Sequence, residues 1–152
     1  MEARMTHPIS VLPDAFKALM SLGKAIRAGG LDETTAGLVE LRASQLNGCS
    51  VCVDMHARDL RKNGESDERL FGVAAWRESP HFSAAERAAL ALTEAATLLP
   101  HPGDRVPDDV WAEAAEHFEE RQLAALVLEI AMINLWNRIN ITIKEPVGNW
   151  TG

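Results

Sequence analysis

The sequence predicts an all-α protein of about seven helices. Apolar residues recur with helical periodicity between recognisable start and stop signals, and no alternating run of β-branched residues competes with that pattern. The composition agrees, because alanine is abundant and tyrosine, which favours strands, is absent. The helices are expected at residues 13–28, 33–46, 49–63, 66–76, 84–99, 107–117 and 119–142.

Residues with strong positional preferences delimit the first two expected helices. Pro13 opens the first, since proline is tolerated in the first turn of a helix, and the pair Gly29-Gly30 ends it. Asp32 caps the N-terminus of the second, because its short carboxylate can accept from backbone N–H groups that have no partner within the helix. The leucines of this second helix are expected to face the core.

The segment NGC ends the second helix and starts the third. Asn47 or Gly48 supplies the turn between them. The third helix begins at Cys49 and runs to about Asn63, where Gly64 closes it in the left-handed conformation that glycine adopts without strain. The second and third helices are therefore expected to form an antiparallel pair.

Capping signals also mark the next three helices. Ser66 begins the fourth, and Ser83 with Glu86 forms a capping box for the fifth. Pro107 opens the sixth. The segment PHPGDRVP, residues 100–107, is expected to be the longest loop.

The seventh helix, residues 119–142, is apolar almost all round. Such a helix is buried, and part of it is expected to lie against another subunit. Asn134, Asn137 and Asn140 recur every three residues along it. They predict a buried polar network at a subunit contact in preference to a ligand site. The segment KEPVGNWTG that follows is expected to be a loose tail.

Length and composition suit one domain. With 152 residues, 47% of them hydrophobic, a single domain is expected over residues 1–152, with its core at about 31–142. The net charge of -7 argues against nucleic acid or an anionic membrane as partner, since both bind clustered Lys and Arg. The N-terminal stretch lacks the apolar run of a signal peptide, and no stretch of about 18 apolar residues is evident, so a cytoplasmic location is expected.

Cys49, Cys52 and His56 form a C-x-x-C-x-x-x-H segment that contains both cysteines of the chain. Helix positions three and four apart share one face, with Cα atoms about 5 to 6 Å apart. This spacing fits a disulfide, whose Cα atoms lie roughly 4.4 to 6.8 Å apart. In a reducing compartment a lone C-x-x-C is typical of catalysis or metal binding. The segment predicts a redox dithiol with a histidine one turn away.

Each sulfur has one feature that favours the reactive thiolate. The positive end of the helix dipole lies near Cys49, and His56 lies one turn beyond Cys52, whose proton it can accept. We assign Cys52 as the attacking thiol and Cys49 as the resolving thiol, because a positioned base also supplies a proton to the leaving group. Glu40, about two turns before the bend, is the best placed residue to orient His56. The alternative is that Glu40 is an ordinary solvated carboxylate on the helix surface.

Zinc binding is the main rival interpretation of the cysteines. The C-x-x-C pair and the histidine supply three ligands, but no second pair supplies a fourth. Haem attachment requires a histidine directly after the second cysteine, where Val53 stands. No metal or other cofactor is therefore expected. The remaining alternative is two buried cysteines on an apolar packing face.

The segment ELRASQLNGCSVCVDMHARDLRKNGE resembles the core of the alkylhydroperoxidase D (AhpD)-like or carboxymuconolactone decarboxylase family, in its small single-domain, peroxidase-related branch. The segments AAWRES, FSAAERAALALTEA and NLWNRIN continue the likeness. The resemblance implies an AhpD-like helical bundle with the C-x-x-C at the start of the third helix, and a homo-oligomer, either a trimer or a hexamer.

The resemblance also implies a chemistry. In that family the second cysteine attacks the peroxide, the first resolves the sulfenic acid, and a histidine and a glutamate relay protons. These roles fall on Cys52, Cys49 and His56, but the position of the glutamate in the longer founding enzymes corresponds to Gly37, with Glu40 one turn on. The function implied is a thiol-dependent hydroperoxide reductase that takes a hydroperoxide as substrate and an external dithiol, by analogy a lipoyl-bearing protein, as reductant.

Two other functions remain open from the sequence. A redox sensor or disulfide-exchange protein without efficient peroxidase turnover would use the same cysteine chemistry. A carboxymuconolactone decarboxylase-like enzyme would share the fold without relying on the dithiol.

Overall fold

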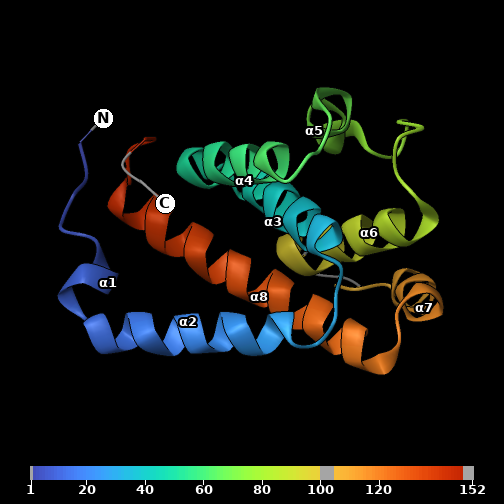
Figure 1. Cartoon of the computed structure of the whole chain (residues 1–152), viewed down its shortest axis with the longest axis horizontal. Helices are drawn as coiled ribbons and strands as arrows, with labels where there is room; N and C mark the ends of the chain where they lie inside the picture. The colour runs from blue at the N-terminus through green and yellow to red at the C-terminus, as the bar shows by residue number, and fades with distance from the viewer. Residues whose placement is uncertain (1, 100–104, 149–152) are drawn as a thin grey trace.

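All the secondary structure in the computed structural model is helical over residues 2–99 and 105–148, the parts of the chain that it describes (Figure 1). This confirms the all-α fold class. The helices are α1 (Pro8–Val11), α2 (Pro13–Arg27), α3 (Glu33–Asn47), α4 (Ser50–Lys62), α5 (Asp67–Gly72), the 3-10 turn η1 (Val73–Ala75), α6 (Ala84–Leu98), α7 (Asp108–His117) and α8 (Glu120–Ile143).

Helix α3 lies at the centre of the bundle and packs against α4, α6 and α8. In Figure 1, α8 crosses the molecule diagonally, with α2 on one side and the α3–α4 pair on the other. Two groups of buried side chains flank α3. One joins it to α4, α5 and α6: Leu38, Leu41, Leu60, Leu70, Val73, Trp76, Phe82 and Leu90. The other joins it to α6, α7 and α8: Val39, Ala89, Leu92, Ala114, Phe118, Leu123, Leu126 and Ile130.

The N-terminal segment lies beside the C-terminal end of α8 (Figure 1). The backbone N–H of Arg4 donates to the carbonyl of Ile143 at 2.8 Å, and its guanidinium donates to the carbonyl of Thr142 at 2.9 Å. These contacts satisfy two of the last carbonyls of α8, which have no partner within the helix. They also bring His7, which caps α1, close to the α8 surface.

The expected helix starts match the structure where a side-chain cap was identified. The Asp32 carboxylate accepts from the backbone N–H groups of Thr34 and Thr35 at the start of α3. At the start of α6, Ser83 and Glu86 form the expected capping box. Such caps are local, so the sequence alone identifies them.

The structure agrees with the expected number of about seven helices and differs in two details. Helix α1 was not predicted, because four residues form only one turn and show no periodicity. The expected helix at 66–76 is α-helical only to Gly72 and continues as the 3-10 turn η1. Most of the loop expected at 100–107 lies outside the described residues, as does the end of the expected tail.

Helix α8 is long and apolar enough to cross a membrane by length and composition, with a mean hydropathy of 1.2 over an 18-residue window. The helix is not an unbroken apolar run, since it also contains Glu129, Asn134, Asn137 and Asn140. Half of that window is buried inside the molecule, where α8 packs against α2, α3, α6 and α7, as the core helix of a bundle does. Several apolar side chains on its other face are exposed: Val127, Leu128, Leu135 and Ile141.

Candidate functional site

A tight turn between α3 and α4 positions the two cysteines. Gly48 has φ 72°, and its N–H donates to the carbonyl of Gln45, while the N–H of Cys49 donates to the carbonyl of Ser44. This pair of bonds is a Schellman motif, which requires a left-handed residue at the position of Gly48. Cys49 thereby becomes the N-cap of α4, and Cys52 lies in the first turn. Both sulfurs lie at the positive end of a helix, as the sequence predicts.

Cys49 and Cys52 form a disulfide with a Cα–Cα distance of 5.3 Å. This is the separation that helical spacing predicts for positions three apart. Each cysteine is only 1% exposed. The disulfide is therefore part of the packed interior beneath the α3–α4 turn.

His56 lies one turn beyond Cys52 on α4, and its Nδ1 is 3.2 Å from Oε2 of Glu40 on α3. Because a carboxylate only accepts hydrogen bonds, Nδ1 carries the proton and donates it. In the neutral ring Nε2 then keeps its lone pair. That Nε2 is buried and has no hydrogen-bond partner among the described residues. A histidine held in this way is oriented as a base.

A second carboxyl group, Glu129 on α8, hydrogen-bonds to Glu40. Burial raises the pKa of Glu129, and the negative charge of Glu40 raises it further, to about 8. For Glu40, burial also acts to raise the pKa, but the hydrogen bond and charge of His56, with smaller effects from Glu129 and Arg27, leave it below its usual value. At neutral pH Glu40 is thus ionised and Glu129 protonated. We call Glu40, His56 and Glu129 the relay cluster.

The relay cluster opens on a cavity of about 560 Å³ between α2, α3, α4 and α8. Its wall includes all three members of the cluster, Arg27 from α2 and Lys62 from α4. A site with a few convergent polar groups in such a hollow is suited to a small ligand. The cavity gives the buried imidazole an approach from solvent.

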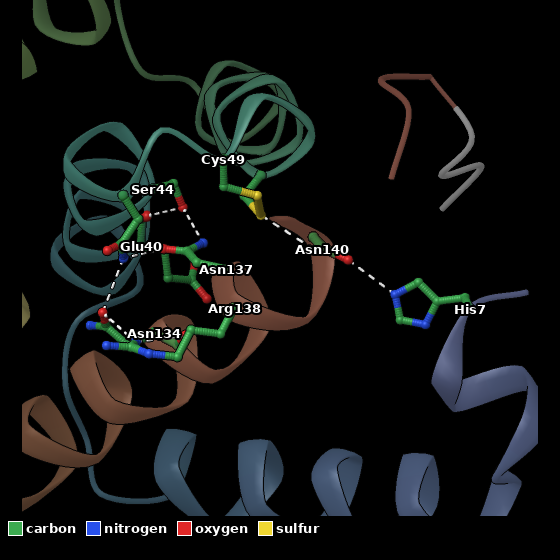
Figure 2. The surroundings of a disulfide bond; sticks show 10 residues. His7, Glu40, Ser44, Cys49, Asn134, Asn137, Arg138 and Asn140 are labelled. Carbon is green, nitrogen blue, oxygen red and sulfur yellow. Dashed lines mark hydrogen bonds between the residues drawn. A yellow bond between two sulfur atoms is a disulfide. The ribbon is translucent and has the colours of Figure 1, made fainter. Parts of the chain in front are cut away.

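The opposite side of the disulfide meets α8 through Asn140 (Figure 2). Its Nδ2 donates to Sγ of Cys52 at 3.3 Å, and its Oδ1 lies 3.0 Å from Nε2 of His7. Asn140 is 4% exposed. Figure 2 shows the Asn140 amide between the disulfide and the His7 ring, so His7 is linked to the disulfide through Asn140.

The other asparagines of α8 belong to a separate group, the asparagine network of Ser44, Asn47, Asn134 and Asn137. Nδ2 of Asn47 donates to the side-chain oxygens of both Asn134 and Asn137, and Nδ2 of Asn137 donates to the Ser44 hydroxyl at 3.0 Å. The sequence predicts a buried polar network here, and one exists. It joins α8 to α3 within one chain, and the expected subunit contact at these residues stays a prediction.

The four residues that the sequence proposes for the site form two pairs, the Cys49–Cys52 disulfide and the His56–Glu40 contact, with His56 one helical turn beyond Cys52 on α4. The structure also explains why Glu40 contacts His56 in place of a residue at Gly37. A Cβ at Gly37 would lie 2.7 Å from Cδ2 of Leu60, a buried core side chain. A glutamate at that position would therefore displace the core of the α3–α4 pair.

Three residues of the site were missed by sequence reasoning or given another role. Glu129 had a usable signal, because it is a lone carboxyl group in the apolar run LVLEIAMIN. Asn140 was grouped with the asparagine network by its spacing. His7 gave no signal, since only the packing of the N-terminal segment on α8 brings it near the sulfurs.

In the ranges 2–99 and 105–148, no group of three or more His, Cys, Asp or Glu side chains is arranged as metal ligands would be. The Nδ1 atom of His56 is instead directed at Glu40.

Comparison with known proteins gives consistent likenesses. The sequence model of the carboxymuconolactone decarboxylase family matches residues 13–95. The uncharacterized protein YdfG of Bacillus subtilis is 41% identical over 143 residues, which cover 94% of this chain and 95% of YdfG. A crystal structure from Agrobacterium tumefaciens, of a protein of unknown function described as a candidate AhpD antioxidant defence protein, is 34% identical with a TM-score of 0.88, covering 98% of this chain and all of that one.

A relative with a named activity is similar over a shorter stretch. The alkyl hydroperoxide reductase AhpD of Bradyrhizobium diazoefficiens is 33% identical over 76 residues, which are 49% of this chain and 38% of that protein. The match to this alkyl hydroperoxide reductase is thus a partial one. The debrominase Bmp8 shares the fold, with a TM-score of 0.81 over 93% of this chain and 75% of that one, at 20% identity.

Proposed function

The chain belongs to the carboxymuconolactone decarboxylase family, and within it we propose that this protein is a thiol-dependent hydroperoxide reductase. The observation that carries the proposal is the buried Nε2 of His56, one helical turn beyond Cys52, which has no hydrogen-bond partner within residues 2–99 and 105–148, while Glu40 holds the other nitrogen of the ring. A base fixed in this way activates a neighbouring nucleophile.

The oxidative half-reaction begins when the disulfide is reduced. His56 Nε2 takes the proton of the Cys52 thiol, and the thiolate attacks the distal oxygen of a hydroperoxide. The O–O bond breaks, Cys52 becomes a sulfenic acid, and the leaving alkoxide receives the proton that His56 holds. The Cys49 thiol then attacks the sulfenic sulfur, which forms the disulfide and releases water.

The relay cluster supports the proton transfers. Ionised Glu40 stabilises the imidazolium that forms when His56 takes the proton. Glu129, protonated near neutral pH with a pKa of about 8, donates a hydrogen bond to Glu40 and so holds that carboxylate in place. The cavity of about 560 Å³ gives a small hydroperoxide room to reach the imidazole.

An external dithiol closes the cycle by reducing the disulfide, and by family analogy we propose a lipoyl-bearing protein for this role. We also propose a cytoplasmic location, because the cycle needs a reducing compartment. A homo-oligomer, trimeric or hexameric, accords with the exposed apolar side chains on α8 and is tested by light scattering of the purified protein.

The test of the function is peroxide consumption with dihydrolipoamide as reductant, using the parent protein and the variants Cys52→Ser and Cys49→Ser. The parent is expected to turn over, and Cys52→Ser to lose all peroxide reaction. Cys49→Ser is expected to consume about one equivalent of peroxide and then stop, because its sulfenic acid has no partner thiol. Turnover that survives in Cys52→Ser would refute the assigned chemistry.

Two other outcomes identify the remaining functions. A stopped-flow rate of Cys52 oxidation near that of an ordinary thiol would indicate a redox sensor or disulfide-exchange protein, and a rate well above it favours the reductase. Turnover of a lactone or carboxylate substrate with both cysteines replaced by serine would indicate a decarboxylase-like enzyme.

A further inference from the structure

The two sulfurs of the disulfide have different surroundings. Sγ of Cys52 accepts the Asn140 amide at 3.3 Å, from a side chain that is itself only 4% exposed. Cys49 lines a hollow of about 250 Å³ at the end of α8. Ser50 and Val51 lie beside it on α4, and Asn140 itself, Lys144 and Glu145 form the other wall. The Cys52 sulfur thus has a buried hydrogen-bond donor, and Cys49 is the cysteine that lines the hollow, although each cysteine is only 1% exposed.

His7 fixes the orientation of the Asn140 amide. Nδ1 of His7 accepts the backbone N–H of Ile9 at 3.3 Å, so in the neutral ring the proton is on Nε2. That Nε2 therefore donates to Oδ1 of Asn140 at 3.0 Å, which directs the NH₂ end of the amide at Cys52 (Figure 2). A reversed amide would place its oxygen against the Cys52 sulfur and its NH₂ group against the Nε2–H of His7, so both hydrogen bonds would be lost.

We propose that Asn140, held by His7, makes Cys52 the leaving thiolate in the reductive half-reaction, so that the external thiol attacks Cys49 from the hollow at the end of α8. This inference rests on the proposed function, and it identifies which of the two sulfurs the reductant attacks. Asn140 touches a reacting atom and is a catalytic residue in that sense. His7 acts through Asn140 and is a positioning residue.

The chemistry balances without a further cofactor. The thiolate of the external dithiol attacks Sγ of Cys49, a new S–S bond forms, and the Cys49–Cys52 bond breaks with its electron pair on Cys52. The Asn140 N–H then hydrogen-bonds a full negative charge, and such charge-assisted bonds are about twice as strong as neutral ones. The second thiol of the reductant attacks its own bound sulfur, which releases Cys49 and leaves the reductant as a disulfide.

The first test measures the Cys52 thiol directly, from its rate of alkylation by iodoacetamide as a function of pH in the Cys49→Ser background. Adding Asn140→Ala is expected to raise the thiol pKa by about one to two units, the effect of one hydrogen bond to a charged group. The isosteric Asn140→Asp, which presents an acceptor, should raise it at least as far. An unchanged titration in both variants would overturn the proposal.

The matched control is Asn137→Ala, a buried asparagine one turn away on the same helix that bonds to Ser44 and Asn47 and not to sulfur. It should leave the thiol pKa unchanged even if it lowers stability. His7→Ala is expected to raise the thiol pKa by less than Asn140→Ala, and His7→Gln, whose amide N–H can replace Nε2, should restore the parent value. Failure of that rescue would refute the positioning role of His7.

The second test locates the attack. Oxidised parent protein is mixed briefly with glutathione, quenched with N-ethylmaleimide and mapped by mass spectrometry. Glutathione is expected on Cys49 and maleimide on Cys52, whereas glutathione on Cys52 would overturn the proposal. In addition, Asn140→Ala is expected to slow reduction by dithiothreitol roughly threefold to tenfold, because the leaving thiolate is less stable.

Neither measurement uses peroxide. A protein without peroxidase turnover would still give both results if the inference about Asn140 is right. Conversely, peroxidase turnover with glutathione found on Cys52 would leave the proposed function standing and refute only the role of Asn140.

Discussion

Two buried polar regions lie between α3 and α8, and they differ in how their hydrogen bonds are satisfied. The asparagine network is neutral, and each of its members has a partner, with Asn137 fully buried. The relay cluster holds ionisable groups, of which His56 and Glu129 are buried and Glu40 is partly buried, and one of its nitrogens, Nε2 of His56, has no partner among the described residues. Satisfied neutral groups hold helices in register, whereas perturbed ionisable groups in a cavity are typical of chemistry.

Replacing His56 is expected to give the largest difference in effect between a substitution in the relay cluster and one in the asparagine network. His56→Ala removes the base, so the rate of Cys52 oxidation by peroxide should fall about a hundredfold to ten thousandfold. The measurement is single-turnover stopped flow with the reduced protein at fixed pH. The asparagine network provides the control, since Asn137→Ala should keep the folded protein's rate within about threefold of the parent. Equal losses in both variants would mean that the two regions do not differ in role.

The relay cluster should also make stability depend on pH. The pKa of Glu129 rises from 4.5 to about 8 on folding, so between these values the folded state binds a proton that the unfolded state has released. The stability that this group contributes is full below pH 4.5 and is lost as pH rises toward 8. Glu40, whose pKa is lowered, acts in the opposite sense and loses its contribution as pH falls below 4.5.

Glu129→Gln isolates the larger of these effects, because glutamine does not titrate. As pH rises from 5 to 8, the parent loses the contribution of Glu129 and the variant does not. The free energy of unfolding of the variant, measured relative to the parent, is therefore expected to increase over this range by on the order of 3 kcal/mol. Urea unfolding of both proteins at three pH values in that range measures the difference. Parallel pH profiles for the parent and the variant would show that Glu129 ionises normally.

The smallest expected effect comes from a substitution in the asparagine network, which should change the stability of the protein and leave its reaction with peroxide unchanged. Asn137→Ala leaves the Ser44 hydroxyl and the Asn47 amide short of one partner each, so the free energy of unfolding should fall by about 1 to 3 kcal/mol. Unfolding by urea at neutral pH, with peroxide reactivity measured on the same samples, checks it. Lost peroxide reactivity without lost stability would assign the network to the site.

Much of the site could be predicted from the sequence because its parts are close together in the chain. Cys49, Cys52 and His56 lie on one helix, and Glu40 lies on the helix that a short turn folds back against it, so spacing and helix geometry suffice. Glu129, Asn140 and His7 lie far away in sequence. Their approach depends on how α8 and the N-terminal segment pack, which local periodicity does not specify.

The sequence by itself determined the helical class, the caps at Asp32 and Ser83, and the dithiol at the start of α4, because each depends on interactions within a few residues. Only the tertiary structure decided that α8 brings a neutral carboxyl group to one side of the site and an amide to the other. Burial in the packed bundle changes the proton affinity of Glu129 and directs Asn140 at one sulfur, and burial is a property of the whole fold.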